Sequence, residues 1–463
     1  RLTRPLLPEE PEAEDGPAPS APTLRVGLFN APDGKPATAA RIYFTCNSDF
    51  KIVAASGDVV HDNGKSQHQW EVTFRPENNI VELRDNSRNI QYTSKQSFRI
   101  VPTGRQGSVL IKSAVFKDSI GIDIGDREVR GSLDILPNPY GFKLVNEANM
   151  EEYLYGVVSA GLPHGSPSDA YKAQAVVSRT RALWEKAHRQ ENLERMDICD
   201  SAACQKYMGL SEEMREAALA VRATQGIYLT QNGEVARVLQ HDNCGGITED
   251  GSALGAPQLV SVSDGEKPIA ATRSADQLEL WTHEYPAADR YCEASGLTPP
   301  VESRWMRVLS AADISRRAEA VRYLGAIRHM HAAKRAASGR ILALEIVGAK
   351  DTIVLEGDKA IADVLSPGSL RSTLFTIQPL MSGSKADRFI LWGAGTGHGV
   401  GLCRAGALGQ ASMGRKWDAI IKHYFPRLQL NLPVEKRPAA AAAKSAAPAA
   451  GRRKPKNPHW NRQ

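Results

Sequence analysis

The chain has 463 residues, of which 42% are hydrophobic and 24% are charged, so it is long enough to bury a sizeable core and to hold more than one structural unit. It contains no run of about 20 apolar residues that could span a bilayer. Because the chain starts at Arg1 without an initiator Met or a signal peptide, we expect a processed or truncated N-terminus.

Residues 1–22 are acidic and rich in proline, which predicts a linker. From residue 23 to 140, short runs of β-prone residues alternate with turn signals such as PDGK and DNGK, and this pattern predicts strands and hairpins. The N-terminal part of the fold is therefore predicted to be rich in β-structure.

Residues 141–432 mix helical and strand patterns and are predicted to form the core of the protein. MEEYLYGVV begins a helical spacing, the run from Ser166 to Gln190 continues it, and an Asn-Gly turn separates two alternating runs. Further helices are expected over 211–224, 305–338 and 417–423, and a strand pair over GRILALEIVG and DTIVLEG. Since helices and strands are segregated, the predicted class is α+β.

The net charge of +6 comes from the C-terminal end of the chain. After Pro433 there are eight Lys or Arg residues against Glu435 alone, a net of +7 that leaves the remainder near −1. A basic segment rich in Ala and Pro cannot bury apolar surface, so residues 433–463 are predicted to be a disordered, solvated tail. Contact of this tail with nucleic acid or wall polymer is the alternative, and it predicts salt-sensitive binding that is lost with the tail.

Several motifs occur in a fixed order between Val129 and Pro426. They read VRGSLDI, FKLVNEANMEEYLYGVV, AYKAQAVVSRTRAL, DICDSAACQKYMG, CGGIT, SGRILALEIVG, LRSTLF and GTGHGVGLCRAGALGQASMGRKWDAIIKHYFP. In this order they resemble the stage II sporulation protein D and LytB (amidase enhancer) family of bacterial cell-wall proteins.

The resemblance implies an exported protein of the periplasm or cell surface that acts on peptidoglycan glycan strands. Family members of the sporulation type are lytic transglycosylases that cut between N-acetylmuramic acid and N-acetylglucosamine after stem peptides have been removed. The LytB type enhances a partner N-acetylmuramoyl-L-alanine amidase. Nucleic acid is not an expected partner of the folded part, and a Ser-His-Asp hydrolase is not supported, because Gly-x-Ser-x-Gly is absent from the sequence.

The family's catalytic carboxylate is missing from this sequence. A glycosidic bond needs a carboxylic acid to protonate the leaving oxygen, and the family's Glu follows the Gly-Val-Val helix. Here that segment reads GVVSAGLP, with Gly161 at the position of the acid, although Gly161 also suits a turn into Leu162 and Pro163. The expectation is a protein that binds glycan or assists an amidase; the alternative is an active lytic transglycosylase with a relocated acid. Candidates for that acid are Glu151, Glu152, Asp169, Asp200, Asp242 and Glu249, of which the first three also suit the first turn of a helix.

Cys199, Cys204, His241 and Cys244 form two short-spaced pairs of the ligand types that Zn²⁺ prefers. Some sporulation-type members bind zinc near the segment that matches Cys199 to Cys204, and Cys403 is an alternative to His241. Four protein ligands would make the zinc structural. Disulfides, or free thiols, are the competing interpretations.

A glycine-rich segment around His398 is the other candidate site, since glycines allow a ligand close to the backbone. His398 either orients a sugar hydroxyl or packs in a turn. The family usually has Gln at the position of Arg404, which is a second departure from its pattern. Side chains that would line a sugar groove, or would pack instead, are Tyr153, Tyr155, Gln174, Arg179 and Tyr207.

Overall fold

The structure is a computed structural model that describes residues 21–85, 90–116, 125–188, 196–267, 275–283, 289–366, 370–383 and 385–431. The predicted linker lies almost entirely outside these residues, and the predicted basic tail lies wholly outside them. None of the helices in the described ranges is both long and apolar enough to cross a membrane.

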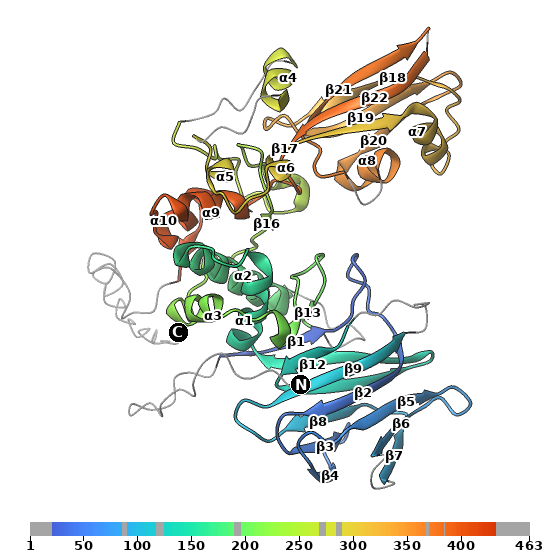
Figure 1. The fold of residues 1–463 in the computed structure, drawn as a ribbon, viewed down its shortest axis with the longest axis vertical. Helices are drawn as coiled ribbons and strands as arrows, with labels where there is room; N and C mark the ends of the chain where they lie inside the picture. The colour runs from blue at the N-terminus through green and yellow to red at the C-terminus, as the bar shows by residue number, and fades with distance from the viewer. Residues whose placement is uncertain are drawn as a thin grey trace, which may run out of the picture.

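The N-terminal part is a curled, almost wholly antiparallel sheet, drawn in blue and cyan in Figure 1. Its strands run in the order β4-β3-β8-β11-β12-β2-β5-β6-β7, while β9 pairs with β2, β10 with β9, and β1 with β12 and β13. Alternate residues of β2, such as Ile42 and Phe44, are fully buried, as the period of two in the sequence requires. The strands are β1 Thr23–Gly27, β2 Ala39–Cys46, β3 Phe50–Ala54, β4 Val59–Gly64, β5 Trp70–Arg75, β6 Ile80–Asp85, β7 Ile90–Ser94, β8 Phe98–Pro102, β9 Ser108–Phe116, β10 Arg127–Arg130, β11 Ser132–Asn138, β12 Gly141–Asn149 and β13 Ile198–Cys199.

A group of helices packs on this sheet and shares one hydrophobic core with it. Helix α1 follows β12 directly, and the Asn149 side chain caps it by accepting a hydrogen bond from the Glu151 amide over 2.9 Å. Figure 1 shows α1, α2 and α3 between the sheet and the C-terminal helices α9 and α10. This arrangement confirms the predicted α+β class, with a β-rich N-terminal part packed on a mixed core. The helices are α1 Met150–Gly161, α2 Ser168–His188, α3 Arg215–Ala223, α9 Arg404–Ser412 and α10 Trp417–Tyr424.

The segment between residues 304 and 394 forms two three-stranded sheets around a separate hydrophobic core. One sheet has the order β17-β22-β21 and the other β18-β19-β20, and α7 and α8 pack beside them. This part lies at the top of Figure 1. Its elements are β17 Arg304–Ser310, α7 Ala311–Ala318, β18 Ile327–Arg335, β19 Ile341–Gly348, β20 Thr352–Glu356, α8 Gly357–Leu365, β21 Phe375–Ser382 and β22 Lys385–Ala394.

The prediction of helix over 305–338 is wrong for most of that range. Only α7 is helical there, because β17 pairs along its whole length with β22 and β18 pairs with β19. In β17, pairing with a strand distant in sequence overrides local propensity. The expected strand pair is confirmed as β19 and β20, and the expected closing helix as α10.

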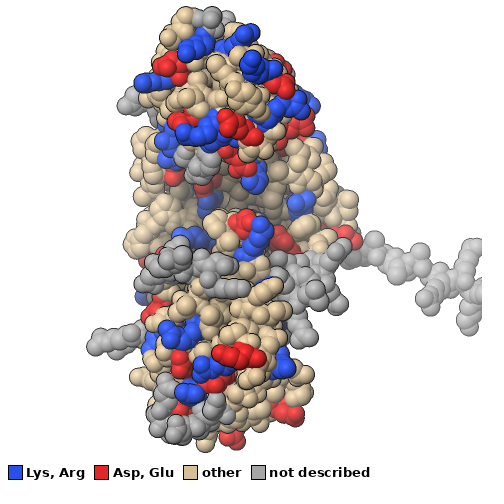
Figure 2. All heavy atoms as spheres, turned by 90° about the vertical axis from the view of Figure 1, so that its right-hand side faces the viewer, with Lys and Arg blue, Asp and Glu red and all other residues tan. Residues whose placement is uncertain are grey.

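Short elements join the two halves of the core. The parallel pair β16 and β23 places His241 directly opposite Cys403, and the Asn-Gly hairpin forms β14 and β15 as predicted. On the face in Figure 2, basic and acidic side chains are interspersed. The short elements are η1 Gly209–Glu212, β14 Leu229–Gln231, β15 Glu234–Val235, β16 Gln240–His241, η2 Ser252–Leu254, α4 Ala275–His283, α5 Tyr291–Ala294, α6 Pro300–Ser303, β23 Leu402–Cys403 and β24 Gln429–Leu430.

Candidate functional site

Two hollows meet where α1 ends and α9 begins. The first, of about 320 Å³, lies between Gly161, Glu302 and Leu408. The second, of about 490 Å³, lies between Arg181 on α2 and His398. Asp242 and Arg404 line both hollows and form an ion pair with each other. We call the two hollows together the cleft.

Gly161 is the last residue of α1, and Arg404 is the first residue of α9. The Arg404 Nη1 donates a hydrogen bond to the Gly161 carbonyl oxygen over 3.2 Å. Its other terminal nitrogen pairs with the Asp242 carboxylate. A guanidinium group therefore lies against the position at which the family's acid is expected.

Gln174 lies beneath Gly161 and is 1% exposed. Its Nε2 donates to Gln240 Oε1 over 2.7 Å and to Ser178 Oγ over 3.0 Å. The Oε1 of Gln174 is buried without a hydrogen-bond partner among the described residues. A Cβ atom at position 161 would lie 3.3 Å from Gln174 Nε2, so any side chain at this position would contact the Gln174 amide.

His398 lines the larger hollow. Its Nδ1 accepts a hydrogen bond from the Val400 amide over 3.0 Å, which leaves the ring proton on Nε2. Burial, with smaller contributions from His241 and Arg340, lowers the pKa of His398 to about 3. A neutral ring can donate a hydrogen bond to a sugar hydroxyl, but it holds no acidic imidazolium proton near neutral pH.

Of the six acids that the sequence suggested, Asp242 is the one that lines the cleft. Three of the others lie near arginines. Glu151 forms an ion pair with Arg179. Asp200 forms one with Arg127, and Glu152 lies near the positive charge of Arg130. Asp169 accepts a hydrogen bond from the Trp417 amide, and Glu249 accepts one from the Ser338 hydroxyl.

Two carboxyl groups in the cleft were not predicted from the sequence, those of Glu185 on α2 and Glu302 on α6. Burial raises the pKa of Glu302, while the positive charge of Arg371 opposes the shift. Glu302 belongs to none of the motifs, and no signal in the sequence places it opposite Gly161. A carboxyl group with a raised pKa in a cleft is a candidate for acid chemistry.

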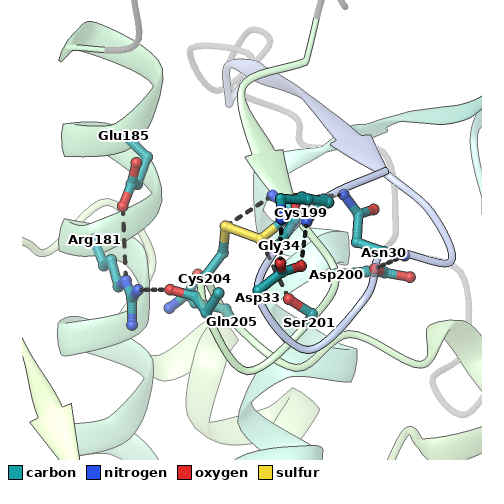
Figure 3. The surroundings of a disulfide bond; sticks show 12 residues. Asn30, Asp33, Gly34, Arg181, Glu185, Cys199, Asp200, Ser201, Cys204 and Gln205 are labelled. Carbon is teal, nitrogen blue, oxygen red and sulfur yellow. Dashed lines mark hydrogen bonds and ion pairs between the residues drawn. A yellow bond between two sulfur atoms is a disulfide. The ribbon is translucent and has the colours of Figure 1, made fainter. Parts of the chain in front are cut away.

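Cys199 and Cys204 form a disulfide. Figure 3 shows this bond between α2, which carries Arg181 and Glu185, and the loop that holds Asn30 and Asp33. Arg181 donates to the Ala203 carbonyl over 2.9 Å, and Ala203 lines the larger hollow. The disulfide thus supports one wall of the cleft, and its two sulfur atoms are not available as metal ligands.

His241, Cys244 and Cys403 lie together, with their ligand atoms within 4.8 Å of one another. All three are buried, and Cys403 is the residue that the sequence suggested as an alternative ligand. The four predicted ligands therefore do not lie together. His241 and Cys244 join Cys403 in a group that could hold a metal ion, whereas Cys199 and Cys204 form the disulfide.

Comparison with known proteins agrees with this geometry. Residues 139–231, which include α1, α2, the disulfide and α3, match the family described as stage II sporulation protein. This part of the chain is therefore similar to the domain of that family. The predicted family resemblance is thereby confirmed, and residues 301–401 match a second family, described as a domain of unknown function, DUF8618.

Two curated proteins are similar to this chain over longer stretches. An uncharacterized protein of Brachyspira hyodysenteriae is 24% identical over 362 residues, which cover 76% of this chain and 84% of the relative. The amidase enhancer of Bacillus subtilis is 21% identical over 298 residues, which cover 59% of this chain. The match spans 39% of the length of that amidase enhancer.

The side chains of residues 139–231 that were expected to line a sugar groove are all buried, namely Tyr153, Tyr155, Gln174, Arg179 and Tyr207. Arg179 is 1% exposed and holds Glu151 through two hydrogen bonds of 2.8 and 2.7 Å. Tyr153 donates to Gln205 Oε1, Tyr207 donates to Asn146 Oδ1, and their ring centroids lie 4.9 Å apart. In this structure these groups pack the domain beneath the cleft, whereas His398 faces it.

Proposed function

We propose that this protein is exported, binds peptidoglycan glycan strands in the cleft without cleaving them, and assists a partner amidase. The observation that carries the proposal is the contact between Arg404 and Gly161. The family's acid is replaced by a residue without a side chain, and a permanently charged group lies against it. The stage II sporulation protein domain and the similarity to the amidase enhancer support a role at the cell wall.

The chemistry of these side chains supports binding over cleavage. Glycoside cleavage requires a group that gives up a proton to the leaving oxygen, and a guanidinium does not do so at any physiological pH. It can, however, hold a carboxylate through two parallel hydrogen bonds. Arg404 pairs with the Asp242 carboxylate in this structure, and it is not an acid catalyst.

The larger hollow has features that suit a glycan strand stripped of its stem peptides. Each muramic acid of such a strand exposes a lactyl carboxylate, and Arg181, Arg237 and Arg404 line this hollow. Trp184 adds an indole ring, with the Arg237 guanidinium 4.9 Å from its centroid. His398 adds a second ring to the lining of this hollow.

The disulfide supports the proposed location. Disulfides persist in oxidising compartments such as the periplasm or the cell surface, and they are rare where thiols are kept reduced. In this proposal, a Zn²⁺ ion at the buried Cys and His group would be structural and would take no part in glycan chemistry.

Co-sedimentation with insoluble peptidoglycan tests the binding proposal. We expect the full chain to bind wall from which an amidase has removed the stem peptides, and to bind wall with intact stems more weakly. Arg237→Ala should weaken binding to the stripped wall about tenfold or more, since a hydrogen bond to a charged group contributes about 1.5–3 kcal/mol. Arg316→Ala, at an exposed side chain on α7, is the matched control. Equal binding by both variants, with equal melting temperatures, would contradict the proposal.

Stimulation of an amidase is tested separately. We expect a purified N-acetylmuramoyl-L-alanine amidase to release stem peptides faster when the full chain is added, and Arg237→Ala to reduce the effect. No change in amidase rate, while binding to the wall persists, would restrict the role to glycan binding.

Glu302 supports a second candidate function, an active lytic transglycosylase with a relocated acid. Its carboxyl group shares a hollow with Gly161, and burial raises its pKa, as a proton donor requires. In this case the unmodified protein would release anhydromuramic products from stripped glycan, and Glu302→Gln would abolish them. Products that survive Glu302→Gln would exclude Glu302 as the acid.

A further inference from the structure

A second cluster of potential ligands adjoins the group of His241, Cys244 and Cys403. The ligand atoms of Cys244, Cys292 and Asp264 also lie within 4.8 Å of one another. Cys244 belongs to both groups, so its sulfur lies within that distance of every other member. The three thiols are fully buried and His241 is 4% exposed.

We infer that Cys244, Cys292, Cys403 and His241 bind one tetrahedral Zn²⁺ ion, and that this ion fixes the wall of the cleft from behind. Zn–S bonds of about 2.3 Å in a tetrahedron place ligand atoms roughly 3.8 Å apart, and the Cys244 sulfur lies within 4.8 Å of the ligand atom of each of the other three residues. Three thiolates and one imidazole are a common ligand set for structural zinc. The inference does not depend on what the cleft binds.

His241 is oriented as a zinc ligand requires. Its Nδ1 lies 3.1 Å from the Val400 carbonyl oxygen, to which it donates, so Nε2 carries the free lone pair. That Nε2 is buried and has no hydrogen-bond partner among the described residues. Metal-binding histidines generally donate their second ring nitrogen to a carbonyl or carboxylate in this way. A metal ion would satisfy the buried Nε2, which otherwise lacks a partner at a cost in free energy.

Backbone amides point at the sulfur atoms. Cys403 Sγ accepts from the Cys244 amide over 3.2 Å and from the Gly406 amide over 3.3 Å. Cys244 Sγ accepts from the Gly246 amide over 3.3 Å. Gly245 and Gly246 both have positive φ, at 73° and 111°, and this turn aims the Gly246 amide at the sulfur. Such donors stabilise thiolates, the form in which cysteine binds metal.

Asp264 is better placed as an outer partner than as a ligand. One of its oxygens accepts from the Cys292 amide over 2.8 Å, and the other accepts from the Tyr424 hydroxyl. With both oxygens occupied, the carboxylate holds Cys292 in place. Outer-shell carboxylates of this kind orient the residues that bind the metal.

The four ligands come from three segments that also build the cleft. His241 precedes Asp242, and Cys403 precedes Arg404, so the ion would fix both ends of the Asp242–Arg404 ion pair. Cys292 lies on α5, just before the segment 297–302 that lines the smaller hollow. Release of the ion should therefore loosen the cleft without touching its lining residues.

Metal analysis of the full-length protein, purified without chelators, tests the inference. We expect about one Zn²⁺ per chain, retained in a Cys199→Ser/Cys204→Ser control and lost in Cys292→Ser and Cys403→Ser. If these two variants fail to fold, replacement of Zn²⁺ by Co²⁺ in the unmodified protein gives a second readout. We expect absorption bands of a tetrahedral, thiolate-bound Co²⁺. A protein that takes up neither metal, a disulfide between any two of the three thiols, or zinc that leaves with Cys199 and Cys204 would overturn the inference.

Discussion

Arg404 donates a hydrogen bond to the Gly161 carbonyl oxygen over 3.2 Å, and it joins the two positions at which this chain departs from the family pattern. These residues are 243 apart in the sequence, and each departure taken alone is uninformative. The contact brings together the two positions at which the family resemblance led us to expect a glutamate and a glutamine.

This contact predicts that Gly161→Glu alone does not create a lytic enzyme. The new carboxyl group would lie beside Arg404, whose charge would lower its pKa and keep it ionised. Gly161→Glu/Arg404→Gln removes that cation and should release anhydromuramic products. The backbone at Gly161 does not have a positive φ, and a Cβ needs only a small shift of Gln174. Arg404→Gln is the control; equal products from the single and double Glu variants would show that Arg404 has no such influence.

Arg179 is predicted to matter for folding more than for binding. Its guanidinium is 2% exposed and holds Glu151 as well as the carbonyl oxygens of Ile227 and Val221. Arg179→Ala leaves a buried carboxylate unpaired, which should lower the free energy of unfolding by about 3–5 kcal/mol. Urea unfolding measures the loss. Arg316→Ala, which breaks an exposed ion pair, should cost about 0–1 kcal/mol. Loss of glycan binding by Arg179→Ala at unchanged stability would point instead to direct contact.

The disulfide is predicted to contribute little to the free energy of unfolding and more to glycan binding in the cleft. It joins residues only five apart, and closing so short a loop contributes about 2 kcal/mol. Cys199→Ser/Cys204→Ser should therefore fold, melt at a lower temperature and bind stripped wall less tightly, since Ala202 and Ala203 line the larger hollow. Cys46→Ser, at a buried thiol in the N-terminal sheet, is the control for loss of a cysteine. Unchanged wall binding by the double variant would separate the disulfide from the cleft.

Glu302 predicts a dependence of stability on pH. Because burial raises its pKa in the folded protein, the unfolded chain releases this proton at lower pH than the folded chain does. The stability that the protonated Glu302 provides is thus fully present below the pKa of an ordinary Glu. It is lost as the pH rises through the pKa that Glu302 has in the folded protein. Glu302→Gln lacks this loss, so its melting temperature should rise relative to the unmodified protein between pH 4 and about pH 7. A difference that stays constant over this range would show that Glu302 is solvated normally.

Much of the fold could be predicted because its signals are local. Alternation in β2 and the helical spacing of α2 each lie within one short segment, and both elements form as expected. β18 was predicted to be helical, although it pairs with its neighbour β19. β17 was also predicted to be helical, because its strand character depends on pairing with β22, which is distant in the sequence. Propensity alone does not contain that information.

The site was less predictable for the same reason. The motifs contain Gly161, His398 and Arg404, which line the two adjoining hollows, but they did not distinguish these residues from buried ones such as Tyr153 and Tyr207. Cys292 and Glu302 lie outside every motif. They reach the site only because α5 and α6 fold back toward α9.

Whether the unmodified protein cleaves glycan is measured most simply by analysing the products of stripped peptidoglycan incubated with it. We expect the protein to sediment with the wall, and we expect no anhydromuramic products beyond those of a protein-free control. Anhydromuramic products from the unmodified protein would contradict this expectation, and would show that this cleft holds a working acid despite the glycine at position 161.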